Sequence, residues 1–333
     1  MKSNYRYIVK AFMAMAVIAG TTSCDDFLDR EPMSSISPET YYSTAAQLEA
    51  NLNDEYPNVL PSFGQWTYGI FGEDKGTDNQ IEVNANDRYT QDRWKVPHSE
   101  SDNWKFERIY RINFFLSEAL PKFGEDMSGS QNTISGSVAT IKHYIGEMYF
   151  LRAYEYFKKL QLFGDFPIIN QPLADEMEAL REASKRFPRN EVARFIISDL
   201  DKAYAYMSDV DMATTRINKD VAMLVKSRVA LFEATWLQNF KGTAFVPGGE
   251  GWPGASLHNN YQYPSGNIDN EVKYFLEQAV EASKLVADKY KGSLTENTGV
   301  LQQSADDPSN PYFDMFAQED LSDVKEVLLW RQY

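Results

Sequence analysis

Aromatic rings that stand in loops beside Asn, Asp and Arg are the residues of this chain best suited to binding a ligand. Phe, Tyr and Trp make up 14% of the 333 residues, which is more than a core alone usually requires. A ring can lie under the apolar C–H face of a sugar while neighbouring polar groups hold its hydroxyls. We predict ligand contacts at Trp66, Tyr68, Asp78, Asn79, Asn86, Arg88, Tyr89, Trp94, Trp252, Tyr261 and Tyr263.

The same rings have a structural alternative, which is to pack their loops onto the body of the protein. One sugar face hides about 40 Å² of apolar surface, so each ring contributes on the order of 1 kcal/mol. Useful affinity therefore needs two or three rings acting together. Trp104 is a separate case, because it shares an expected helical stripe with Tyr110 and is predicted to lie in the core.

Signs of catalysis are few. The histidines His98, His143 and His258 are far apart in the sequence and show no metal-ligand spacing. His143 is expected to be a surface or hairpin contact. The sequence holds no G-x-S-x-G motif and no acid pair whose spacing predicts glycoside hydrolysis. We therefore expect no catalytic residue, no metal and no cofactor.

Two polar loops resemble ion or phosphate sites only superficially. Residues 71–79 hold three carboxylates, which could bind Ca²⁺, but their spacing fits no EF-hand and a solvated loop is the alternative. The Gly-rich run 248–252 lacks the Lys-Ser/Thr partner of a phosphate-binding loop, and we interpret it as a flexible loop.

The composition is that of a folded protein that does not bind nucleic acid. Hydrophobic residues make up 43% of the chain, and its length allows one extended domain or two smaller ones. The net charge is −15 and no run of Lys and Arg is present. Because binding to phosphate backbones needs clustered positive charge, nucleic acid is excluded as a partner.

Residues 1–23 are predicted to be a signal peptide. Lys2, Arg6 and Lys10 form a positive region, and the uncharged run 11–20 is too short to cross a hydrocarbon layer of ~30 Å as a helix. Small residues then precede Cys24, the single cysteine. This arrangement resembles the lipobox of bacterial lipoproteins and implies acyl chains on Cys24. An ordinary signal peptide with an incidental cysteine is the alternative.

Helical periodicity dominates the rest of the chain, so we predict a mostly α fold with few short strands. Apolar residues recur at helical spacing between stretches rich in Gly, Pro, Asn and Asp. The predicted helices span residues 45–60, 102–120, 133–163, 189–207, 219–240 and 270–290. Short runs such as 324–330 (VKEVLLW) have the pattern of strands.

An internal repeat is visible at an offset of about 80 residues. VARFIISDLDKA from Val192 compares with VKYFLEQAVEAS from Val272. The preceding helices pair more loosely, FLRAYEYF with KSRVALFE, which places Arg152 opposite Arg228. Two hairpins with similar apolar faces should stack, as in tetratricopeptide-like folds, with long loops inserted between the helices. Chance similarity between two amphipathic helices is the alternative.

Several motifs resemble those of the SusD-like (RagB/SusD) outer-membrane lipoproteins. CDDFLD from Cys24, followed by Pro32, is similar to the start of the family's mature chains. EMYFLRAYEYFKKLQLFGDFPII from Glu147 resembles the long helix that ends at Phe-Gly-Asp-x-Pro. AMLVKSRVALFEA, NPYFDMF and KEVLLWRQY resemble later segments, in the family's order. Family members usually continue further, so we expect residues 24–333 to form a SusD-like helical domain that lacks the C-terminal part of the fold.

The resemblance implies a lipoprotein on the outer face of the outer membrane, with Asp25 and Asp26 as its export signal. It implies that the protein captures oligosaccharides and covers a SusC-like TonB-dependent transporter. It also implies that residues 71–79 lie near the ligand face, which makes polar contacts to ligand a third option for this loop. A peptide ligand, as in the RagB branch, is the alternative. A surface hydrolase is a third hypothesis, for which the sequence supplies no nucleophile, metal site or acid pair.

Overall fold

The computed structural model describes residues 41–61, 80, 103–124, 126–208, 212–301, 303–304 and 306–332. The chain divides into two compact units, Met1–Tyr41 and Tyr42–Tyr333. The predicted signal peptide, Cys24 and the loop 71–79 lie outside the described residues. Every helix described below belongs to the second unit.

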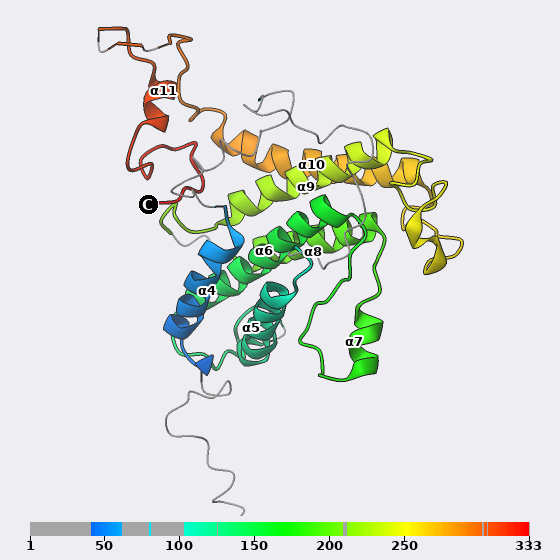
Figure 1. Ribbon diagram of the computed structural model, residues 1–333. Coiled ribbons are helices and arrows are strands. Elements are labelled where there is room, and N and C mark those ends of the chain that lie inside the picture. The colour runs from blue at the N-terminus through cyan, green and yellow to red at the C-terminus, as the bar shows by residue number, and fades with distance from the viewer. Residues whose placement is uncertain are drawn as a thin grey trace, which may run out of the picture. The chain divides into compact units, whose positions relative to one another are not determined.

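Long helices form where periodicity predicts them, so the predicted mostly α fold is confirmed (Figure 1). They are α4 (Ala45–Val59), α5 (Glu107–Phe123), α6 (Val138–Phe163), α8 (Arg189–Tyr206), α9 (Lys219–Asn239) and α10 (Ile268–Tyr290). Three shorter elements were not predicted, namely α7 (Met177–Ala183), the 3₁₀ helix η3 (Pro253–Ser256) and α11 (Pro311–Phe316).

Local capping explains where several helices begin and end. The Thr44 hydroxyl oxygen accepts a hydrogen bond from the Gln47 backbone N–H, and the Gln47 side-chain oxygen accepts one from the Thr44 backbone N–H. This capping box starts α4. Asn218 and Asn267 cap α9 and α10 more simply, because in each case only the Asn side-chain oxygen accepts hydrogen bonds from backbone N–H groups of the first turn. Helix α6 ends at Gly164, whose φ of 68° is costly for a residue with a side chain.

The helices pack as two antiparallel hairpins, which confirms the stacking that the repeat predicts. We call α6 with α8 the first hairpin and α9 with α10 the second hairpin; α8 also packs against α9, so the two hairpins are in contact (Figure 1). Helices α4 and α5 pack on the other side of α6. Lys241 pairs with Asp269 at one end of the second hairpin and Lys289 with Asp220 at the other, which fixes its antiparallel direction.

Buried ion pairs tie these layers together. In the first hairpin, the Arg152 guanidinium donates two hydrogen bonds to Asp199 at 2.6 and 2.8 Å, and both side chains are buried. Arg189 at the start of α8 makes a similar pair with Glu233 of α9. Such pairs stabilise little on balance but leave a costly unpaired charge when one partner is lost. The two ion pairs therefore favour the observed pairing of α6 with α8 and of α8 with α9.

Some expectations are wrong in detail. Residues 103–106 precede α5 rather than belonging to it, so Trp104 is half-buried outside the helix and Tyr110 is 52% exposed. For His143 only the surface alternative is wrong, because the side chain is buried. Its Nδ1 lies 3.5 Å from the Ser208 hydroxyl oxygen just after α8, a contact within the first hairpin, and its Nε2 lies 3.0 Å from the Ile217 carbonyl oxygen.

The predicted strand at residues 324–330 is also absent from the described structure. The segment forms turns and extended backbone, and hydrogen bonds at Leu328 and Trp330 tie it to the segment before α9. The Leu328 backbone oxygen accepts a hydrogen bond from the side chain of Asn218 at 2.9 Å. The Trp330 backbone N–H and indole N–H donate to the backbone and side-chain oxygens of Thr214. Two isolated bridges pair described residues with each other, and neither involves residues 324–330, so this segment pairs with no described strand.

Among the described residues, no helix is both long and apolar enough to cross a membrane. Within the same residues, no group of three or more His, Cys, Asp or Glu side chains is placed to hold a metal ion.

Candidate ligand-binding cavity

The long connection between α9 and α10, residues 240–267, brings together three of the predicted ligand contacts. The ring centroids of Trp252 and Tyr261 lie 5.6 Å apart, and those of Tyr261 and Tyr263 lie 5.2 Å apart. The His258 ring stacks on Trp252 at 5.9 Å. The other predicted ligand contacts lie outside the described residues. They are Trp66, Tyr68, Asp78, Asn79, Asn86, Arg88, Tyr89 and Trp94.

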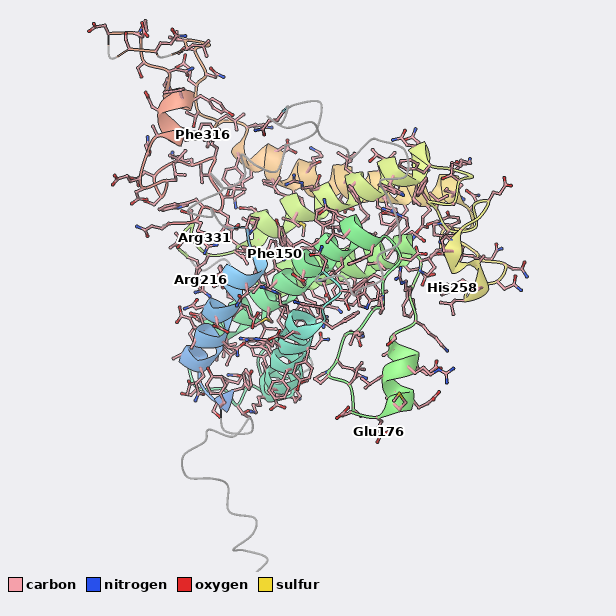
Figure 2. The ribbon with its side chains drawn as sticks, viewed as in Figure 1. Phe150, Glu176, Arg216, His258, Phe316 and Arg331 are labelled. Atoms are coloured by element: carbon pink, nitrogen blue, oxygen red, sulfur yellow. The ribbon has the colours of Figure 1, made fainter. Side chains whose placement is uncertain are left out.

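Hydrogen bonds hold this connection against the first hairpin. The Trp252 indole N–H donates to the Asp165 carboxylate at 2.7 Å, and the Tyr261 hydroxyl donates to the Asn190 side-chain oxygen at 3.0 Å. Figure 2 shows His258 in this connection, and its Nε2 lies 2.7 Å from the backbone oxygen of Arg186. These hydrogen bonds hold the connection in a defined position, although residues 248–252 within it were predicted to form a flexible loop.

Trp252, Tyr261 and Tyr263 are all held by contacts within the protein. Trp252 is only 5% exposed. Burial raises the pKa of both Tyr261 and Tyr263, so their hydroxyls stay protonated and act as donors. The Tyr263 hydroxyl donates to the Pro247 backbone oxygen at 2.7 Å. These rings support the loop, and of the three only Trp252 lines the cavity beside it.

A cavity of about 460 Å³ lies between this connection and the helices. This volume is typical of pockets that bind small molecules. Its walls come from the end of α6, the start of α8, the C-terminal half of α9 and the connection itself. The lining residues are Gln161, Leu162, Phe163, Gly164, Asp165, Arg186, Arg189, Trp236, Ala244, Phe245, Trp252, Pro253, Gly254 and Leu257.

A backbone bridge assembles one polar wall of the cavity. Phe166 and Phe187 exchange backbone hydrogen bonds at 3.1 and 3.0 Å, which closes the connection that carries α7. The bridge brings Asp165 and Arg186 to the same cavity. Asp165 accepts hydrogen bonds from the Trp252 indole and the Arg189 backbone, and burial raises the pKa of its carboxyl above the usual value.

Phe245 is the freest aromatic ring in the cavity. It is 60% exposed, and its backbone oxygen accepts a hydrogen bond from the Trp236 indole N–H at 3.0 Å. The loop position is thus fixed while the ring remains open to a ligand. The sequence prediction missed Phe245, although it lies in the same Gly-bearing stretch as Trp252 and meets the criterion used for the other loop rings.

A second cavity of about 440 Å³ lies near the N-terminal half of α9. Phe150 and Tyr154 of α6 stack there at 6.1 Å, and Trp330 forms part of the wall. Its walls are more apolar than those of the first cavity and hold none of the predicted ligand contacts. The first cavity, which combines an exposed ring with guanidinium and carboxylate groups, is the stronger candidate site.

Comparison with known proteins identifies the family. Residues 26–231 match a family model described as SusD-like, starch-binding and associating with the outer membrane. Two curated relatives are the SusD-like proteins P2 and P25 of Formosa agariphila, each 25% identical. The alignments cover 72% and 64% of this chain, and 46% and 41% of the relatives. The chain therefore spans less than half the length of the curated relatives it matches.

Solved structures align with this chain at lower sequence identity. A SusD-like carbohydrate-binding protein from Bacteroides fragilis aligns with a TM-score of 0.44 and 15% identity, covering 78% of this chain and 42% of that one. A SusD-like carbohydrate-binding protein from Bacteroides vulgatus aligns with a TM-score of 0.42 and 14% identity, covering 78% and 47%. Since the family model matches well over half of its residues, this chain belongs to the SusD-like family.

Proposed function

We propose that this protein binds oligosaccharides at the cell surface, without cleaving them, and passes them to a SusC-like TonB-dependent transporter. The observation that carries the proposal is the cavity beside residues 240–267, where the exposed Phe245 ring stands among fixed polar groups. The description of the matched family, starch-binding and associating with the outer membrane, supports the same ligand class and location.

The cavity supplies both parts of sugar recognition. Phe245 offers an open ring face, and the half-buried Trp236 stands beside it. Gln161 of α6 and the guanidinium of Arg186 supply hydrogen-bond donors for hydroxyl groups. One ring contributes on the order of 1 kcal/mol, so a single sugar unit would bind weakly and a chain of several units would bind better.

The location within the cell is the second part of the proposal. Acyl chains on Cys24 would hold the protein in the outer membrane, because two or more chains anchor a protein stably where one does not. The mass of the N-terminal peptide of the membrane-extracted protein tests this step. A peptide that begins at Cys24 and carries acyl chains supports the anchor, and a Cys24 thiol without them contradicts it.

Binding is tested by calorimetric titration of the purified chain with a panel of neutral and acidic hexaoses. Phe245→Ala should weaken binding about five-fold, since about 1 kcal/mol of stacking is lost. Phe316→Ala is the matched control, because Phe316 is 71% exposed on α11 and does not line the cavity. Equal affinity of the Phe245→Ala protein would remove this ring from the site.

The same preparation separates the alternatives. Binding of peptides but of no glycan would favour the RagB-type hypothesis. Cleavage of any panel member would contradict the proposed non-catalytic role, which is why each titrated sample is analysed for products.

A further inference from the structure

The cavity carries a cationic group that a neutral sugar would not require. Arg186 is exposed, lines the cavity and forms no ion pair with a carboxylate in the described part of the chain. A guanidinium offers several N–H donors in a planar fork that matches the geometry of carboxylate and sulfate oxygens.

Contacts on both sides hold Arg186 in place. Its guanidinium carbon lies 4.6 Å from the centroid of the Trp104 ring, in cation–π geometry. Its backbone oxygen is held by His258, and the next residue, Phe187, forms the bridge to Phe166. An arginine that is already ordered loses little side-chain freedom when it binds an anion.

Arg189 adds a second donor to the same wall. Its Nε and Nη2 atoms bond to Glu233, and the side chain is only 4% exposed. Its Nη1 atom makes no hydrogen bond within the described residues and lies beside Gly164. A Cβ atom at Gly164 would come within 3.4 Å of Nη1, so the glycine leaves this donor open to the cavity.

The one carboxylate in the cavity wall does not oppose an anion strongly. Both Asp165 oxygens accept hydrogen bonds from the protein itself, one from the Trp252 indole and one from the Arg189 backbone. The net charge of −15 over the whole chain acts at longer range, and salt screens it over about 8 Å under physiological conditions. Glu233 balances the charge of Arg189, so the guanidinium of Arg186, which forms no ion pair among the described residues, is the cation that faces an anion in the cavity.

From this geometry we infer that the cavity prefers glycans bearing a negative group, a uronate carboxylate or a sulfate ester, which Arg186 binds with help from Arg189. The inference rests on the proposed function and specifies its ligand class. The carboxylate and the sulfate present the same chemistry to the arginines, and the experiment distinguishes them.

The test compares matched glycans by calorimetric titration of the full chain. One pair is hexagalacturonate and its methyl-esterified form, and the other is a sulfated carrageenan hexaose and its desulfated form. Neutral gluco-hexaoses complete the panel. We expect the charged member of at least one pair to bind ten-fold or more tightly than its neutral partner, and added salt to reduce the difference.

Variants then assign the preference to Arg186. Arg186→Gln should remove the preference for the charged member, and Arg186→Lys should retain part of it. Lys185→Gln is the matched control, because it removes one positive charge at the neighbouring position. The Lys185 side chain pairs with Glu182 and does not line the cavity. Unchanged circular dichroism shows that each variant is folded.

The possible failures are distinguishable. Equal binding of both members in both pairs, or a preference that survives in the Arg186→Gln protein, overturns this inference. Binding of neutral glycans alone also overturns it but leaves the proposed function standing. If no glycan in the panel binds, the proposed function fails and this inference fails with it.

Discussion

The two hairpins share an apolar pattern but differ in how it is covered. Ile196 and Leu200 of the first hairpin are completely buried, because α8 packs between α6 and α9. The residues 80 positions later, Leu276 and Val280 of the second hairpin, are 37% and 63% exposed. A repeat in sequence therefore predicts a repeated helix, whereas burial depends on the number of neighbours that the helix acquires.

The charged positions show the same difference. Arg152 of the first hairpin is buried against Asp199, and its Nη1 also donates to the side chain of Asn113. Arg228, which the repeat places opposite it, is exposed on α9. The arginine at this position of the repeat is therefore buried in the first hairpin and exposed in the second, and this contrast can be tested by mutation.

The largest expected effect comes from the paired arginines. Arg152→Met should lower the free energy of unfolding by about 3–5 kcal/mol, because Asp199 is left buried without its partner. Arg228→Met should change it by less than about 0.5 kcal/mol, as is usual for exposed positions. Urea denaturation measures both. Similar losses in the two variants would contradict the difference in burial.

A smaller effect is expected from the apolar pair. Leu200→Ala should cost about 3 kcal/mol, since it removes buried methyl groups and leaves a cavity. Val280→Ala should cost less than about 0.5 kcal/mol, because its side chain is largely exposed. If Val280→Ala instead costs as much as Leu200→Ala, the exposed face of the second hairpin must be covered by something outside the described residues.

The smallest effect concerns the polar contact between the hairpins. Burial alone would raise the pKa of Glu271, but hydrogen bonds from Arg194, Asn190 and Ser265 hold it below the usual 4.5. Glu271 therefore stabilises the fold fully above about pH 4.5, and this contribution is lost as the pH falls below that value through the lowered pKa of the folded state. Glu271→Gln should cost about 1–2 kcal/mol at pH 7 and progressively less in acid.

Denaturation of both proteins between pH 3 and pH 7 checks this prediction. Asp269→Asn is the control, since Asp269 is exposed and pairs with Lys241 at the surface. A stability difference between wild type and Glu271→Gln that does not change with pH would show that the charge of Glu271 is not what matters.

The sequence predicts helices well because their signals are local. Periodicity alone places both ends of each long helix to within five residues. Helix α7 was missed because it buries none of its residues and so carries no apolar stripe. Trp104 was wrongly placed in a helix because its sequence spacing to the apolar residues of α5 fits helical periodicity, whereas α5 begins only at Glu107.

The cavity could be predicted only in part, because contacts distant in sequence build it. Trp252 was predicted to be a loop aromatic residue, but the sequence gives no sign of the hydrogen bond from its indole N–H to Asp165, which is 87 residues away. Arg186 enters the cavity through the Phe166–Phe187 bridge and had no local signal. Phe245 had such a signal, which was overlooked. The side-chain types in the sequence indicated the kind of ligand chemistry, but only the tertiary contacts determine which of these residues line the cavity.

We propose that ligand occupies the cavity between the two hairpins beside residues 240–267. Hydrogen-exchange mass spectrometry of the chain, with and without a saturating concentration of the tightest-binding glycan, tests it most directly. We predict slower exchange in residues 240–267 and around Asp165 and Arg186. Unchanged exchange in these segments, at a concentration where titration shows full binding, would place the ligand elsewhere and contradict the account.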